Sequence, residues 1–418
     1  MSNLPQELVD MVIDNVDLPK DLKALALVSR PFVAGTQARI FRHLTLSSDT
    51  GTDLFKRESS GTLSRLSAIL SQSQHLGAYA GTDLFKRESS GTLPRLSAIL
   101  SQSPHLGAYV RDLHINLDLG RSDIHVLLAP TLQLLRGVSR TAITYIRGCH
   151  WSWSSWTDEM RAALINLLCL PSMRSLALDR CTDVPAAIIR HAMASYEEVV
   201  LKVSGIDFHP VEFVRPGHGK SLKRLVLLIA YRAEDNLDFH DLMVSAELTA
   251  SSAHLKHLDV EVLDDVDLIT KHAVSVENLT INCYSFPEFA LPANPALRSV
   301  TINAHPRMEV VYTLREVIRF IPRLPSAAPE LEFLAISICG IVRNVWRSAT
   351  LPPSSDADDA LMELPNLRNI RFSVGCEAPE FEERLRAALP RTVAAGLLSF
   401  PTDIEPPDRW DTTAFFSQ

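Results

Sequence analysis

Gly217-His-Gly219-Lys220-Ser221 and Asp49-Thr50-Gly51 are the stretches that come nearest to catalytic motifs. Glycines followed by lysine and serine can wrap a nucleotide phosphate. A phosphate-binding loop, however, needs a further glycine where Val214 stands, and it follows a strand instead of preceding one. Asp-Thr-Gly supplies one carboxylate of an aspartic-protease pair, and the sequence has no second copy to share its proton. We therefore expect neither a nucleotide site nor a protease site, and we interpret 49–51 as a turn.

Metal ligands and nucleophiles are the next chemistry to consider. The spacing of His254 and His257 would suit a metal on a helix, but both flank leucines in a strand-like segment, and we expect surface histidines. The acidic clusters at 264–267 and 356–359 lack the glycine and the spacing of a calcium loop, and we interpret them as solvated turns. The sequence contains no Gly-x-Ser-x-Gly elbow and no Cys/His pattern typical of a nucleophile. We expect no catalytic residue, no metal and no cofactor.

Three of the five tryptophans, Trp151, Trp153 and Trp156, lie within a six-residue stretch. Tryptophan is enriched at the centres of protein–protein interfaces, so the cluster is a candidate surface for binding a target protein. In the alternative interpretation, Trp151 and Trp153 share one face of a strand and pack on a neighbouring unit. The sequence favours that alternative.

The overall composition indicates the class of protein. Of the 418 residues, 46% are hydrophobic and 22% are charged, with a net charge of -8, as in ordinary globular domains. The longest apolar stretch, around 225–231, is far shorter than the roughly 18 residues of a membrane helix, and residues 1–7 lack the features of a secretory signal. We expect a soluble cytoplasmic and/or nuclear protein with no membrane partner and, given its mild acidity, no nucleic-acid partner.

Residues 51–80 are repeated almost unchanged as residues 81–110. The copies differ at three positions, Ser64/Pro94, Gln74/Pro104 and Ala80/Val110. Structural repeats usually agree only at a few core positions, so this pair resembles a recent tandem duplication or a gene-assembly error. Each copy predicts one helix, over 62–71 and 92–101. The second copy is the better integrated, because Val110 leads directly into an alternating strand.

A weaker pattern, apolar-x-x-apolar-x-apolar, recurs through the rest of the chain. Its clear copies are Val110/Leu113/Ile115, Met173/Leu176/Leu178, Leu222/Leu225/Leu227, Leu255/Leu258/Val260, Val276/Leu279/Ile281, Leu297/Val300/Ile302, Leu331/Leu334/Ile336 and Leu367/Ile370/Phe372. Two weaker candidates, Ile143/Tyr145 and Leu201/Val203, fill the gaps, and a last strand is expected at Leu398/Phe400. The segments between copies vary in length, and those at 308–320 and 380–389 predict helices. We expect stacked units, none of which buries its apolar face alone.

The strand pattern resembles the leucine-rich repeat, Leu-x-x-Leu-x-Leu-x-x-Asn/Cys. Two copies carry the full form and end at Cys181 and Cys339, whereas the others lack the last position. The resemblance implies an α/β fold in which residues 110–400 form an irregular leucine-rich-repeat-like solenoid.

The first 46 residues predict three short helices. The first starts near Pro5, and its apolar residues at helical spacing are Leu8, Met11, Val12 and Val16. The second starts at Asp21, and the apolar residues on one of its faces are Leu22, Leu25 and Val28. After an interruption at 29–31, the third runs through 34–41. A core of this size is marginal and usually needs a partner or a neighbour to complete its burial.

This N-terminal segment closely resembles the F-box. The family signature appears in order as Leu4-Pro5-Gln6-Glu7-Leu8, Asp21-Leu22-Lys23-Ala24-Leu25, Val28-Ser29-Arg30 and Phe41-Arg42. The tryptophan that frequently follows Val-Ser is absent. In the family, this module docks on the Skp-type adaptor of SCF (Skp–cullin–F-box) ubiquitin ligases. The adaptor contacts that the resemblance implies are Leu4, Pro5, Leu8, Val12, Leu22, Leu25, Val28 and Ser29.

The two resemblances together imply the organisation of the chain, which is similar to that of F-box proteins common in mushroom-forming fungi. The expected parts are an F-box over 1–46, a linker with the duplication over 47–109, the solenoid over 110–400 and a tail over 401–418. We expect a non-catalytic substrate receptor that binds a Skp-type adaptor, and through it a cullin-RING ligase, and whose solenoid binds an unknown target protein. The alternatives are an interaction scaffold that is not coupled to ubiquitination, and an enzyme whose site lies in the solenoid.

Overall fold

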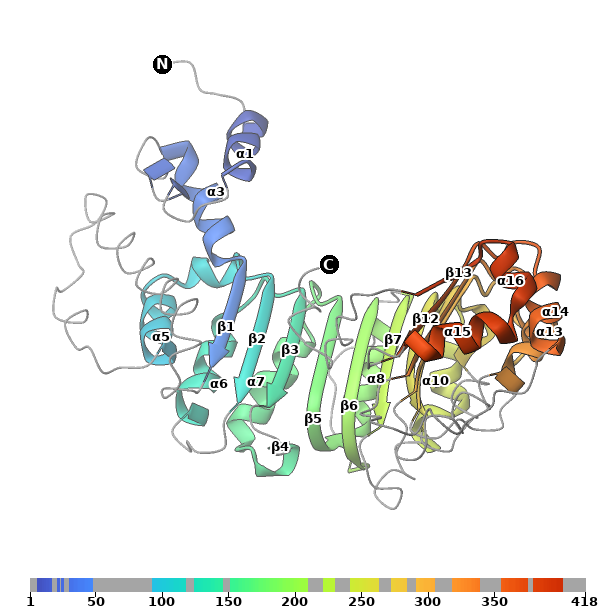
Figure 1. Cartoon of the computed structure of the whole chain (residues 1–418). Coiled ribbons are helices and arrows are strands. Elements are labelled where there is room, and N and C mark those ends of the chain that lie inside the picture. The colour runs from blue at the N-terminus through green and yellow to red at the C-terminus, as the bar shows by residue number, and fades with distance from the viewer. Residues whose placement is uncertain are drawn as a thin grey trace. The chain divides into compact units, whose positions relative to one another are not determined.

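The computed structural model describes residues 6–16, 21–22, 24–25, 30–47, 92–117, 124–145, 151–209, 221–229, 241–262, 272–283, 291–304, 318–338, 355–374 and 379–400. The chain forms two compact units. The first comprises Met1–Val184 with Pro210–Pro216, and the second comprises Pro185–His209 with Gly217–Gln418. Both are built from parallel strands and helices (Figure 1), so the predicted α/β class is confirmed.

In the first unit, four strands pair in parallel in the order of the chain. They are β1 (His43–Ser47), β2 (Asp112–Leu117), β3 (Arg140–Tyr145) and β5 (Ser175–Pro185), and the short β4 (Trp151–Ser152) pairs with β5. The described helices are α1 (Gln6–Asp14), α3 (Arg30–Phe41), α5 (Thr92–Gln102), α6 (Ile124–Leu134) and α7 (Asp158–Leu168), with the 3-10 helices η3 (Pro104–Ala108) and η4 (Trp153–Ser155). Helix α6 packs against α5 and α7, and α6 and α7 lie behind β1–β3 in Figure 1.

The second unit repeats this plan. Its strands, also parallel and in chain order, are β6 (Glu198–Asp207), β7 (Arg224–Ile229), β8 (His257–Val262), β9 (Asn278–Cys283), β10 (Ser299–Ala304), β11 (Phe333–Ile338), β12 (Asn369–Val374) and β13 (Leu398–Ser399). The described helices are α8 (Ala186–Ser195), α10 (Ala246–Ser251), η6 (Ala273–Ser275), η7 (Ile321–Arg323), α13 (Leu324–Ala327), α14 (Ser355–Glu363), α15 (Pro379–Ala388) and α16 (Pro390–Ala394). Helix α8 packs on β6 and α10, and α14 packs on α13 and α16.

The recurring apolar pattern predicted the register of this sheet. Residues at its second position pair across the strands as Leu225, Leu258, Leu279, Val300, Leu334 and Ile370. Residues at its third position pair as Leu227, Val260, Ile281, Ile302, Ile336 and Phe372. All of them are buried. Because side chains alternate between the two faces of a strand, these residues form two continuous rows inside the unit.

The register of the two weaker candidates was wrong by two residues. In β3 the paired positions are Thr141 and Ile143, since Thr141 lies opposite Leu113, and not Ile143 and Tyr145. In β6 they are Val199 and Leu201, not Leu201 and Val203, because Val199 lies opposite Leu225. A shift of two residues keeps the same face of the strand buried, so alternation alone could not distinguish the registers.

Three helix boundaries also differ from the prediction or fall partly outside the described residues. Helix α3 starts at Arg30 and not at residue 34. It includes Pro31, which a helix tolerates in its first turn. The acidic cluster 356–359, predicted as a solvated turn, belongs to α14. Of the predicted helix at 308–320, only 318–320 are described, and these are helical. The motifs at 49–51, 217–220 and 264–267 lie outside the described residues.

Candidate functional site

Helix α1 is held in place by a small apolar core. Val9 and Ile13, one helical turn apart, are buried together with Leu22 and Phe32. The residues packed around this core are Val16, Leu25 and Ile40. Arg39 of α3 donates Nη1–H to the carbonyl of Ile13, at the C-terminal end of α1, where a positive charge complements the helix dipole. These interactions fix α1 on α3.

A second apolar face of α1 stays exposed. Leu8, Met11 and Val12 retain 44%, 57% and 45% exposure. Single exposed apolar residues are ordinary, but these three stand at i, i+3 and i+4 and form one stripe. The same spacing is how an amphipathic helix enters the apolar groove of a partner. We call these three residues the α1 stripe.

The structure divides the predicted adaptor contacts into three groups. Leu8 and Val12 belong to the α1 stripe. Leu22 is 4% exposed and Leu25 is half-buried, and both pack in the helical core. The other four, Leu4, Pro5, Val28 and Ser29, lie outside the described residues. Met11 was part of the helical pattern but was not among the predicted contacts, although it is the most exposed residue of the stripe.

Helix α3 passes into the sheet of the first unit with one residue between them. Phe41 ends the helix and is buried, and β1 begins at His43. The carbonyl of Arg42 accepts the backbone N–H groups of Arg111 and Asp112, both at 2.9 Å. The carboxylate of Asp112 lies 2.7 Å from Nδ1 of His43. Backbone hydrogen bonds thus join the N-terminal helices to the first two strands.

The tryptophan cluster is packed inside the first unit. Trp151 is 1% exposed, and Trp153 and Trp156 are each 4% exposed. The rings of Trp151 and Trp156 stack with their centroids 4.4 Å apart. Trp151 lies in β4 and Trp153 in η4, so the two do not share the face of one strand. Their burial contradicts the prediction that these residues form a target-binding surface, because the rings offer almost no area to a partner.

In the second unit, polar side chains stand on the face of the sheet opposite the buried rows. Nδ2 of Asn282 donates to Oδ1 of Asp259 at 2.7 Å, and Nδ2 of Asn303 donates to Oδ1 of Asn282 at 2.9 Å. This row crosses β8, β9 and β10 and holds each amide in one orientation. Asn282 is buried, so Asp259 and Asn303 are the members of the row that stay partly exposed to a partner, and their fixed orientation limits the side-chain entropy lost on binding. We call these three residues the polar row.

A line of charged residues of both signs runs along the N-terminal ends of the strands in the same sheet. Its members, each directly before a strand, are Glu197, Lys223, Lys256, Glu277, Arg298, Glu332 and Arg368. Nζ of Lys256 lies 2.9 Å from Oε1 of Glu277, and Nη1 of Arg298 lies 2.7 Å from Oε1 of Glu332. The hydrogen bond from Lys256, aided by the nearby charges of Lys256, Arg298 and His257, lowers the pKa of Glu277. The charges neutralise one another along these strand ends.

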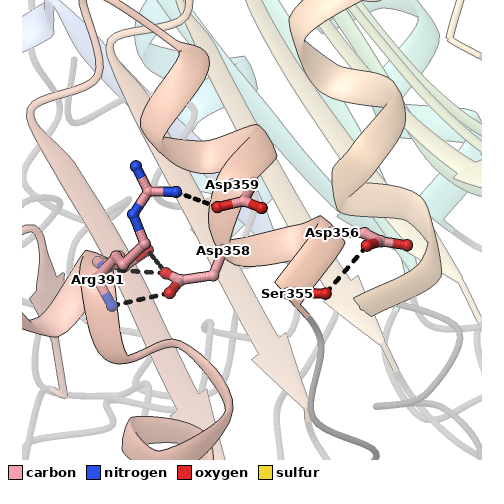
Figure 2. A network of polar contacts seen from close by, with 6 residues as sticks. Ser355, Asp356, Asp358, Asp359 and Arg391 are labelled. Carbon is pink, nitrogen blue, oxygen red and sulfur yellow. Dashed lines mark hydrogen bonds and ion pairs between the residues drawn. The ribbon is translucent and has the colours of Figure 1, made fainter.

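A buried carboxylate joins α14 to α16 (Figure 2). Asp358 is 2% exposed, and its oxygens accept the backbone N–H groups of Arg391 at 2.8 Å and Thr392 at 2.9 Å, and the Thr392 hydroxyl at 2.5 Å. The neighbouring Asp359 forms an ion pair with the Arg391 guanidinium. Because Leu389, at the start of α16, has no capping side chain, Asp358 satisfies the first N–H groups of that helix from another element. This network is structural.

Other ionisable groups are also placed in the interior. Burial raises the pKa of the Cys283 thiol to about 12, and burial followed by the charge of Asp183 raises that of Cys181. A thiol with so high a pKa is a poor nucleophile at neutral pH. His254 and His257 are exposed, and in the described part of the chain no three His, Cys, Asp or Glu residues are placed to hold a metal ion.

Two surfaces are therefore left as candidates for function, the α1 stripe of the first unit and the polar row of the second. No helix within the described ranges is long and apolar enough to cross a membrane. Comparison with models of known protein families and with curated protein sequences found no match to this chain.

Proposed function

We propose that the chain is a substrate-receptor subunit of an SCF-type ubiquitin ligase, and that its N-terminal helices are an F-box that binds a Skp-type adaptor. The observation that carries this proposal is the α1 stripe, which leaves three apolar residues exposed on a helix whose other face is packed. Leu8 of the stripe closes the Leu-Pro-x-Glu-Leu signature. Full burial of one such side chain contributes roughly 1.5–3 kcal/mol, so three together can anchor an interface.

We further propose that the parallel strands belong to a leucine-rich-repeat-like solenoid. Support comes from the two buried rows, which place the second and third positions of successive motifs opposite each other. Cys181, at the closing position of a complete motif, is fully buried, as that position requires. In this arrangement the face of the sheet that carries the polar row is the surface for the target protein.

In this function the chain carries out no bond chemistry. It holds a target beside the ubiquitin carrier that the cullin-RING ligase supplies, which raises the local concentration of the target's lysines around the thioester. An interaction scaffold would bind the adaptor as well but would not shorten the lifetime of its partner. Inhibition of the cullin distinguishes a receptor from a scaffold, because only the target of a receptor accumulates when ubiquitin transfer is blocked.

The α1 stripe gives the most direct test. Leu8→Asp combined with Val12→Asp should abolish co-purification with a Skp-type adaptor, because two carboxylates would have to be desolvated in an apolar groove. The fold should survive, since both residues are exposed. Val274→Asp is the matched control, because Val274 is 66% exposed in the second unit and lies outside the stripe. The proposal fails if the wild-type chain does not bind the adaptor, or if the double variant binds it as well as the control does.

A further inference from the structure

Helix α5 and η3 come from the second copy of the duplicated segment and pack against α6, β1 and α3 in the first unit. We call the space that they fill the segment seat. The apolar side chains that the second copy buries there are Leu93, Leu96, Ile99, Leu100, Leu106 and Val110. Leu96, Leu100, Leu106 and Val110 are 0% exposed. The segment is therefore an integral part of the core.

The segment seat also makes a steric demand on its occupant. A Cβ atom on Gly107 would lie 2.1 Å from the carbonyl oxygen of Leu134. On the other side, a Cβ atom on Gly137 would lie 2.0 Å from the carbonyl oxygen of Ala108. The two backbones approach so closely that the segment must carry glycine at position 107. This requirement is far more specific than an apolar pattern.

The first copy, residues 51–80, meets the same requirements. Its residues at the buried positions and at the glycine are Leu63, Leu66, Ile69, Leu70, Leu76 and Gly77. Each is identical to its counterpart thirty residues later in the chain. At these positions the segment seat has no means of distinguishing the two copies.

Two of the three positions at which the copies differ favour the second one. Pro94 lies in the first turn of α5 and Pro104 is the first residue of η3, where proline restricts the unfolded chain at little cost to the helix. The third difference, Ala80 against Val110, does not bear on the exchange, because Val110 is bonded to Arg111 and keeps its buried place whichever copy fills the segment seat. The observed arrangement is thus the more stable of two that the sequence allows.

We propose that the segment seat accepts either copy, so that residues 51–79 replace residues 81–109 when the second copy is damaged. The thirty residues of the displaced copy then lengthen the connection to β2 instead of the connection from β1. Loop-closure free energy changes slowly with length, so the preference is set mainly by the two proline differences. This inference is independent of the proposed ligase function.

The test compares Leu96→Asp in the full chain and in a chain that lacks residues 51–80. Unfolding of the first unit in urea is followed by the fluorescence of its buried tryptophans, with Trp346→Phe and Trp410→Phe in every variant. Without the first copy, Leu96→Asp should raise the unfolding constant roughly a hundredfold or more, because it buries an unpaired charge. In the full chain the increase should be about tenfold, the cost of Ser64 and Gln74 in place of Pro94 and Pro104.

Leu66→Asp is the matched control and should change nothing in the full chain, since the second copy fills the segment seat. When Leu66→Asp is combined with Leu96→Asp in the full chain, the unfolding constant should rise as much as it does for Leu96→Asp without the first copy, because neither copy then fits the segment seat. The inference is overturned if Leu96→Asp is equally harmful with and without residues 51–80, or harmless without them. It is also overturned if deletion of residues 51–80 alone raises the unfolding constant as much as Leu96→Asp does. The same holds if the Leu96→Asp chain is no less stable when Leu66→Asp is added.

Discussion

His272 is a buried histidine held at both ring nitrogens. Nε2 lies 2.7 Å from the carbonyl of Met243, and Nδ1 lies 2.7 Å from Oγ of Ser252. Because a carbonyl only accepts, Nε2 carries the hydrogen. In the neutral ring Nδ1 accepts the Ser252 hydroxyl, whose single hydrogen is shared with the Thr249 carbonyl at 2.8 Å. Burial lowers the pKa of His272, and the hydrogen bond to Met243 opposes this shift only in part. The folded second unit therefore prefers the neutral ring.

This preference predicts that the second unit loses stability in acid. The unfolded chain binds a proton near the ordinary pKa of about 6.5, whereas the folded chain binds it only at lower pH. The contribution of His272 is therefore fully present above that pH and falls as the pH drops below it. Urea unfolding at pH 7.5 and pH 5 should show a smaller difference for His272→Gln than for wild type. The exposed His254→Gln should keep the wild-type difference, and equal pH dependence in all three proteins would contradict the assignment.

At the level of helices and strands, the capping of α16 by Asp358 predicts a local and measurable loss. Asp358→Ala leaves the N–H groups of Arg391 and Thr392 and the Thr392 hydroxyl without their acceptor, which costs roughly 2–4 kcal/mol. Asp356→Ala, on the exposed side of the same helix, removes a carboxylate whose partner among the described residues is Ser355, and it should cost less than about 0.5 kcal/mol. Thermal unfolding of both variants measures the contrast, and similar losses would show that the cap is not the cause.

The strands could be predicted from the sequence to different degrees. Leu258 and Leu334 were placed correctly, because each occupies a complete apolar pattern in a short strand. Around Thr141 the pattern fails, since a threonine stands where the motif has leucine. Strand β6 extends from Glu198 to Asp207, and its long alternation leaves several registers equally apolar. The pairing partner, which the local sequence does not contain, decides between them.

The candidate site shows a similar limit. Helical spacing identified Leu8 and Val12, but it could not show that Val9 and Ile13 form the covered face, because both sets of residues are apolar and one turn apart. Only the position of α3 decides which face is exposed. Asp358 was missed as a buried cap for the same reason, since its partners lie more than thirty residues away in the chain.

Within the first unit, the way the N-terminal helices join the sheet bears on the proposed function as a whole. A receptor raises ubiquitin transfer only if a bound target stays within reach of the carrier, and a stiff connection restricts the volume that the target explores. Here one residue separates α3 from β1, and its carbonyl is bonded to two backbone amides of the next strand segment. We expect the helices α1 and α3 and the strands β1 and β2 to move together.

Insertion of Gly-Gly-Ser between Phe41 and Arg42 tests this coupling. The α1 stripe is untouched and the Arg42 carbonyl keeps its partners, so adaptor binding and the stability of the sheet should not change. The distribution of distances between spin labels at Asn15 and Ser139 should broaden, and ubiquitin transfer to a bound target should fall because its effective concentration falls. The same insertion after Ser60 serves as the control and should leave both unchanged. A wild-type distribution as broad as that of the Phe41 insertion would show that the junction is flexible, and transfer would then depend on the adaptor alone.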